Sequence, residues 1–241
     1  MEKLLGKTGA GARWLLEWTR SIVVALFVWF LLSTFLLQAF HITSGSMERT
    51  ALVGDFLFVN KLLYGAEVPL VRTHLPSIRE PGHDEVVVIT SPIEDLVLLK
   101  RIVGLPGDTI AMSDGRLVRN GHVVREPYIT LHTDAPRLDS ATREQMRTWQ
   151  SPHLVSPPAS SYHPDSRTWG PLVVPSGSLF ALGDNRDDSF DSRYYGFIPR
   201  ENLRGAPLFI YYSYDPSSWH ALPFLTAIRW NRLLTRPFRA P

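Results

Sequence analysis

Three short stretches of this 241-residue chain carry side chains that could do chemistry. HITSGSM, residues 41–47, holds two serines on either side of a glycine, Ser44 and Ser46. LVLLKRIVG, residues 96–104, places Lys100 within a run of apolar residues. GDNRDDSFDSRYYGFIP, residues 183–199, combines acids, arginines and hydroxyl groups. A serine becomes a good nucleophile only when a neighbouring base accepts its proton, so the question is which base this chain supplies.

Lysine is the base that the sequence favours. The chain has no cysteine, which excludes thiol catalysis, disulfides and cysteine metal sites. Its histidines show no metal-site spacing and no G-x-S-x-G elbow is present, although the composition alone still allows a Ser-His-Asp triad. Burial can lower the pKa of a lysine from about 10.4 towards neutrality. Strand alternation puts Lys100 and Arg101 on opposite faces, so one of them must face inward or lie at an edge.

The third stretch is dense in charge and holds four aspartates and two arginines: Asp184, Asp187, Asp188, Asp191, Arg186 and Arg193. A calcium loop of the EF-hand type needs Gly at its sixth position and Glu at its twelfth. Counted from Asp184, these positions hold Ser189 and Tyr195, which argues against calcium. The alternative is a set of Asp–Arg bridges that holds a site rigid. No pattern indicates a metal or an organic cofactor.

An uncharged apolar segment, residues 21–40, precedes the first stretch and predicts a single transmembrane anchor. The basic residues before it place a cytoplasmic lead at residues 1–20 and the rest of the chain on the outer side of the membrane: Lys3, Lys7, Arg13 and Arg20. A cleaved secretory signal would have a shorter apolar core, and a buried helix of a soluble protein is the other alternative.

Residues 41–215 predict a mainly β catalytic domain, an antiparallel sheet that is barrel-like or a sandwich, because short β-branched runs alternate with Gly and Pro turns. Asn120-Gly121 predicts a two-residue hairpin turn within residues 114–129. The polar segment 131–169 predicts a peripheral insertion with one short helix that starts at Asp139 or Ser140. The basic, apolar tail, residues 216–241, is expected either to lie on a membrane surface or to pack on the β domain.

Together these stretches resemble the bacterial type I signal peptidases, which are membrane-anchored Ser-Lys proteases. The resemblance covers the anchor and most of residues 41–215, and it rests on four boxes in the family's order: SGSM (44–47) with LVGDFLFVNK (52–61), DEVVV (84–88), LKRIVGLPGDTI (99–110) and GDNRDDSFDSRYYGFIP (183–199). It implies an endopeptidase of the inner membrane, with its catalytic domain on the periplasmic side. It also implies cleavage of N-terminal signal peptides from exported preproteins after small residues of the Ala-X-Ala type.

The resemblance also assigns roles by position. Ser46 would be the nucleophile and Lys100 the general base, while the Ser46 amide and the Ser44 hydroxyl would form the oxyanion hole. Ser189 would orient Lys100. Asp191 and Arg193 would brace that region, with Asp184 and Arg186 supporting the fold around it.

Substrate binding is expected at Ile42, Met47, Val87 and Leu99. Of these, Ile42, Met47 and Leu99 would form shallow apolar walls that accept only small side chains. The strand edges at Val87–Val88 and Ile42–Thr43 would pair with an extended peptide. The chain departs from the family where Thr43 and Arg49 replace proline and Ala51 replaces leucine. These changes are expected to loosen the loop slightly and to widen the pocket.

The expected partners are the signal peptides of exported preproteins, membrane lipid and the secretion machinery. No run of like charge indicates nucleic-acid binding. Two other functions compete with this interpretation. A self-cleaving Ser-Lys repressor would need a DNA-binding helix pair, which the sequence does not show. An inactive β domain that only holds peptides at the membrane would not need both Ser46 and Lys100.

Overall fold

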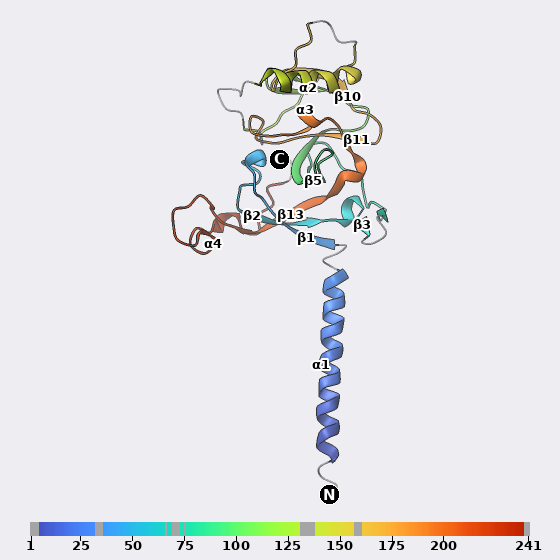
Figure 1. The fold of residues 1–241 in the computed structure, drawn as a ribbon, viewed down its shortest axis with the longest axis vertical. Coiled ribbons are helices and arrows are strands. Elements are labelled where there is room, and N and C mark those ends of the chain that lie inside the picture. Colours follow the sequence, from blue (N-terminus) through green and yellow to red (C-terminus); the bar gives the residue numbers. More distant parts are fainter. Residues whose placement is uncertain are drawn as a thin grey trace.

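The structure is a computed structural model that describes residues 5–31, 36–65, 67–68, 73–74, 76–130, 138–156 and 161–238. A long N-terminal helix, α1 (Leu5–Leu31), extends away from a β-rich domain (Figure 1). All pairings between the named strands are antiparallel, which confirms the mainly β, antiparallel fold.

The strands form a seven-stranded sheet in the order β1-β2-β13-β5-β6-β11-β12, a four-stranded sheet in the order β10-β7-β8-β9, and the pair β3-β4. Their bounds are β1 Leu37–His41, β2 Asp55–Asn60, β3 Glu67–Val68, β4 Thr73–His74, β5 Val86–Thr90, β6 Val97–Gly104, β7 Thr109–Ser113, β8 Arg116–Arg119, β9 His122–Val123, β10 Trp169–Val173, β11 Ser178–Leu182, β12 Ile198–Pro199 and β13 Leu203–Ser213. The other α-helices are α2 Ser140–Gln150, α3 Ser192–Tyr195 and α4 Pro223–Thr226.

The N-terminal segment differs from the prediction of one helix over residues 21–40. Helix α1 includes most of the expected cytoplasmic lead and ends at Leu31, and residues 32–35 lie outside the described part. Leu37–His41 then forms strand β1, which pairs with Asn60–Phe56 of β2. The helix prediction is therefore wrong for residues 37–40, because the edge of β2 offers these apolar residues backbone partners that the local pattern does not reveal. Within the described ranges, no helix combines the length and apolarity needed to cross a membrane.

The large sheet buries apolar side chains on both faces. In β5, Val86 and Val88 point to one cluster, while Val87 and Ile89 point to another. This alternation follows from the two-residue period of a strand. Because β5 is buried on both faces, its sequence is a continuous run of apolar residues. A further cluster lies around the four-stranded sheet and includes Met112, Leu172 and Phe180.

The predicted hairpin is confirmed. Strands β8 and β9 pair Val118 with Val123 and Arg119 with His122. Asn120 and Gly121 form the turn with φ of 53° and 80°, the positive values that a type I′ turn requires.

Helix α2 lies in the polar segment that was expected to be a peripheral insertion. The Asp139 carboxylate accepts a bond of 2.7 Å from the Thr142 N–H and so caps the helix, as expected. Met146 and Gln150 are fully buried. Trp149 and Gln150 donate bonds of 3.0 and 3.3 Å to the Arg193 carbonyl. The inner face of α2 therefore contacts the charged stretch 183–199 directly.

The last part of the described chain packs on the β domain, the second of the two alternatives for the tail. Arg232 binds the fully buried Asp55 carboxylate through two bonds of 3.0 and 2.6 Å. Phe238 is buried beside Met47 and Ala51. Between these contacts and β13, large apolar side chains stay exposed, with Trp219 at 89% and Leu225 at 61%.

Candidate active site

Ser44 and Ser46 lie in a loop, residues 44–48, that follows β1 and that we call the nucleophile loop. Its residues Gly45–Met47 form one 3-10 turn. The Ser44 and Ser46 Oγ atoms are 3.3 Å apart and either can donate. Met47 is 1% exposed and accepts a contact of 3.4 Å from the Asp184 N–H at its Sδ. The buried methionine thus anchors a loop in which Ser44 is exposed and Ser46 is half-buried.

Lys100 lies on β6 with only 2% of its surface exposed. Its Nζ donates a bond of 3.0 Å to the Ser189 Oγ. Burial lowers the pKa of Lys100 from its ordinary value of 10.5 to about 8, although the charges of Asp191 and Asp184 act in the opposite direction. A large fraction of Lys100 is therefore neutral just above physiological pH and can accept a proton.

Gly183 is the point at which the segments of Ser46 and Ser189 meet. A Cβ on Gly183 would lie 2.5 Å from the Ser46 carbonyl oxygen and closer still to the Ser189 Oγ. Only glycine leaves room for this approach. The hydrogen bond of Lys100 goes to Ser189 and not to Ser46. The backbone of Ser46 and the side chain of Ser189 therefore both lie close to Gly183. Lys100 is bound by Ser189, the residue expected to orient it.

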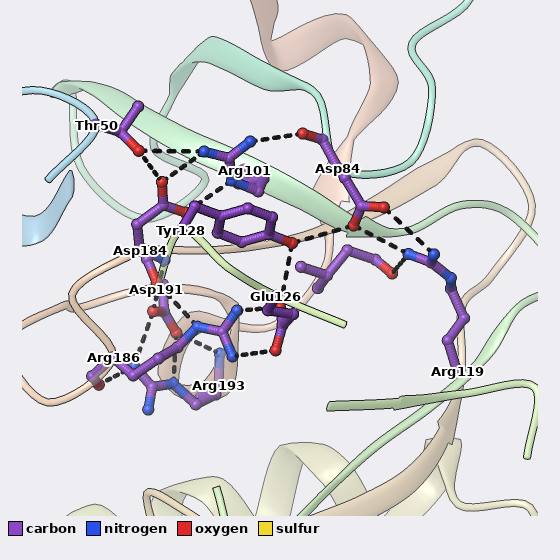
Figure 2. Close-up of polar contacts among 12 residues, drawn as sticks. Thr50, Asp84, Arg101, Arg119, Glu126, Tyr128, Asp184, Arg186, Asp191 and Arg193 are labelled. Atoms are coloured by element: carbon purple, nitrogen blue, oxygen red, sulfur yellow. Dashed lines mark hydrogen bonds and ion pairs between the residues drawn. The ribbon is translucent and has the colours of Figure 1, made fainter. Parts of the chain in front are cut away.

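Both faces of β6 are buried at residues 100 and 101, so Lys100 and Arg101 are both inside the protein. Arg101 is 1% exposed and binds Asp184 through two bonds of 2.8 and 2.6 Å (Figure 2). The Thr50 hydroxyl donates a bond of 2.5 Å to the same carboxylate. Arg101 also lies 3.7 Å from the centre of the Tyr128 ring, close enough for a cation–π interaction.

Asp191 and Arg193 form a second buried pair. The guanidinium donates two bonds of 2.9 Å to the carboxylate, which also accepts the Gly183 N–H at 3.1 Å. Burial alone would raise the pKa of Asp191, but the adjoining Arg193 charge outweighs it and holds the pKa below its usual range. The pair fixes Gly183, Ser189 and the start of α3 in one body, because Arg193 also binds the Ser189 carbonyl at 3.3 Å.

Sequence reasoning missed several members of this network. Arg186 pairs with Glu126, and the Tyr128 hydroxyl donates to Asp84 at 3.2 Å (Figure 2). Glu126 and Tyr128 lie in REPYI, a stretch with no periodic or motif signal. Gly183 and Asn185 flank Asp184 in the sequence. Neither a glycine nor an amide side chain carries a charge or a nucleophile, so the sequence alone does not indicate a role for them.

The expected substrate-binding residues fall into two groups. Ile42, Met47 and Leu99 meet in one cluster, together with Val88. Val87 belongs to the cluster on the other face of the sheet and is fully buried. The expected edge at Val87–Val88 is wrong, because β5 pairs with β6 on one side and with β13 at Gly205 on the other. Among the described strands, unpaired edges lie instead on β6 before Arg101, since β11 pairs there with Arg101–Gly104, and on β1, which is an end strand of the sheet.

The three departures from the family pattern have distinct settings. Arg49 has a φ of 77°, which proline cannot adopt, and it donates a bond of 2.9 Å to the Ile129 carbonyl. Ala51 is fully buried against Met47, whereas Thr43 is exposed. In the ranges that the structure describes, no three His, Asp or Glu side chains form a group that could hold a metal ion.

The structure thus combines a mainly β fold, a buried lysine of lowered pKa and a nearby loop that carries two serines, an arrangement that suits a hydrolase. The sequence model of the family described as "Signal peptidase, peptidase S26" matches residues 15–212. The chain belongs to this family and is a serine endopeptidase.

Individual relatives agree with the family match. Signal peptidase I of Pseudomonas aeruginosa is 36% identical over 223 residues, which cover 87% of this chain and 76% of that protein. Signal peptidase I of Pseudomonas fluorescens is 35% identical with the same coverage. A crystal structure of a signal peptidase I from Enterococcus faecalis is 26% identical, covers 54% of this chain and 98% of its own, and superposes with a TM-score of 0.36.

Proposed function

We propose that this chain removes N-terminal signal peptides from exported preproteins and that Ser46 and Lys100 form its catalytic dyad. The observation that carries the proposal is the buried Lys100 amine, with a pKa lowered to about 8, held by Ser189 beside the nucleophile loop. The relatives named signal peptidase I support the choice of substrate.

The chemistry follows from the neutral amine. Such an amine donates a hydrogen bond to the Ser189 Oγ and keeps its lone pair, which can accept the Ser46 proton. The Ser46 Oγ attacks the scissile carbonyl, and the oxyanion is stabilised by the Ser46 N–H and the Ser44 hydroxyl. Lys100 then delivers the proton to the leaving amine. Water, deprotonated by the same lysine, hydrolyses the acyl-enzyme and releases the signal peptide.

Substrate binding is proposed along the free edge of β6, residues 97–100. An extended peptide would add there as a strand, with its small side chains against Ile42, Met47 and Leu99. We propose that these side chains form a shallow apolar wall, because Met47 and Ala51 are already buried within the cluster. This favours alanine-sized residues before the cleaved bond.

The protein is proposed to be anchored in the bacterial inner membrane, with its N-terminus in the cytoplasm and the β domain on the periplasmic side. The uncharged apolar stretch that begins at residue 21 and precedes β1, together with the basic residues before it, supports this arrangement. The exposed apolar side chains near Trp219 and Leu225 support contact with lipid.

One assay tests the proposal. Purified protein in detergent is incubated with a precursor that ends its signal in Ala-X-Ala, and cleavage is followed by N-terminal sequencing of the product. Ser46→Ala and Lys100→Ala should each reduce the rate by at least ~10³-fold. Ser178→Ala, on β11, serves as the control and should match wild type. Unchanged cleavage in either dyad variant would overturn the dyad, and a wild-type protein that cleaves no exported precursor would favour the peptide-holding alternative.

A further inference from the structure

Asn185 binds the nucleophile loop at three points. Its backbone N–H donates to the Ser46 carbonyl at 3.0 Å. Its Nδ2 donates to the Gly45 carbonyl and to the Glu48 carboxylate, each at 3.2 Å. Among the described residues, the bonds that reach the backbone of Gly45 and Ser46 from outside the loop all come from Asn185.

The chemistry of this contact requires an amide nitrogen. Both partners of Nδ2 are oxygens that can only accept, so a carboxylate of the same shape at position 185 would place an acceptor against two acceptors. Asn185 is 2% exposed, and its Oδ1 has no partner within the described residues. The side chain is thus held through its donors, in a site where an unmade bond is costly.

The backbone of Asn185 is itself immobilised. Asp184 before it is fixed by Arg101, and Arg186 after it is fixed by Glu126. Both ion pairs are almost fully buried. A rigid support therefore extends from the Asp–Arg network to the loop that carries Ser46.

We propose that Asn185 is a positioning residue that, with Glu48 as its charged partner, sets the orientation of Ser46 towards Lys100. This inference rests on the proposed roles of Ser46 and Lys100. Its consequence is that Asn185 acts on the chemical step and has little influence on the binding of substrate, since neither Asn185 nor Glu48 belongs to the apolar cluster of the pocket.

The test uses Asn185→Asp, which keeps the shape and the backbone bond but removes both side-chain donors. We expect kcat to fall ~10- to 100-fold with KM within about threefold of wild type. The ratio of variant to wild-type kcat should recover as the pH falls, because the introduced carboxyl group regains one donor when it is protonated. Asn185→Ala should show the loss without this recovery.

A second variant guards against simple misfolding. In E48Q/N185D the amide introduced at position 48 can donate to the carboxylate introduced at position 185, which reverses the bond, and kcat should rise at least about fivefold above that of N185D. N202D is the matched control, because the Asn202 amide donates at 2.9 Å to the Thr90 carbonyl on β5, away from the nucleophile loop. It should keep the wild-type kcat.

Acylation of Ser46 by a small activated ester, followed by intact mass, gives a readout that needs no peptide substrate. Slower acylation in N185D supports the inference even if no precursor is cleaved. The inference is overturned if N185D acylates and cleaves at the wild-type rate, or if E48Q/N185D is no better than N185D and the losses simply follow the melting temperature. Failure of the proposed function would appear differently, as a wild-type protein that acylates without cleaving any precursor.

Discussion

The proposed role of Lys100 as the general base predicts the pH dependence of the reaction. Because burial lowers the pKa of Lys100 to about 8, we expect kcat/KM to rise with pH and to reach half of its maximum near pH 8. Asp188 raises this pKa by its charge, so Asp188→Asn should move the rising limb to lower pH. Initial rates across pH 6–10 measure both. A limb near pH 6.5, or one that D188N leaves in place, would point to a different base.

The same burial of Lys100 lowers the free energy of unfolding at neutral pH. The unfolded chain binds this proton up to its ordinary pKa of 10.5, whereas the folded protein releases it near 8. Below pH 8 the folded protein carries the full penalty, and stability recovers as the pH rises through 8 to 10.5. Lys100→Met should therefore raise the free energy of unfolding by about 3 kcal/mol at pH 7 and abolish activity.

Urea unfolding of both proteins at pH 7 and pH 10.5 measures this difference. The gain from K100M should be present at the lower pH and small at the higher one. A gain of the same size at both values would contradict the penalty and would attribute the change to packing alone.

Gly183 tests the close contact between the Ser46 and Ser189 segments. A methyl group there would be 2.5 Å from the Ser46 carbonyl oxygen, so Gly183→Ala must displace one of the two segments. We expect a loss of kcat of at least ~10²-fold and a destabilisation of about 1–3 kcal/mol. Gly82→Ala is the control, because its Cβ would have no atom nearer than 3.9 Å. Wild-type activity in G183A would show that the two segments can separate without consequence.

At the scale of elements, the free edge of β6 predicts a pattern in the substrate. A peptide that adds as a strand directs alternate N–H groups to its partner. N-methylation of single residues before the cleaved bond should therefore reduce kcat/KM ~10-fold or more at every second position and little at the positions between. A series of methylated peptides assayed in parallel measures this. Equal losses at all positions would argue against strand addition.

Local signals predicted the elements whose form depends on their own residues. The Asn120-Gly121 turn and the Asp139 cap were predictable because each depends on backbone geometry within a few positions. Strand β1 was not, since the same apolar residues suit a helix until the edge of β2 lies beside them. The choice between helix and strand there is made by a distant partner.

The site divides in the same way. The resemblance alone assigns the roles of the residues in the motif boxes, and strand alternation predicts that Lys100 or Arg101 faces inward or lies at an edge, whereas both are buried. The buried partners could not, because Arg101 meets Asp184 across 83 positions and Arg186 meets Glu126 across 60. The role of Asn185 could not be predicted for a further reason. The role of an amide side chain depends on its hydrogen-bond partners, and the two acceptors of Asn185 lie far away in the sequence.

At the scale of the whole molecule, the proposed topology places the two ends of the anchor on opposite sides of the membrane. The chain has no cysteine, so single cysteines can report on each side without background. Glu17→Cys precedes the apolar segment without changing its basic residues, and Glu94→Cys lies in the exposed turn between β5 and β6. In intact cells with a permeable outer membrane, an impermeant maleimide should label E94C and spare E17C until the inner membrane is opened. Labelling of E17C from outside would reverse the proposed orientation, and labelling of neither before lysis would place the β domain in the cytoplasm.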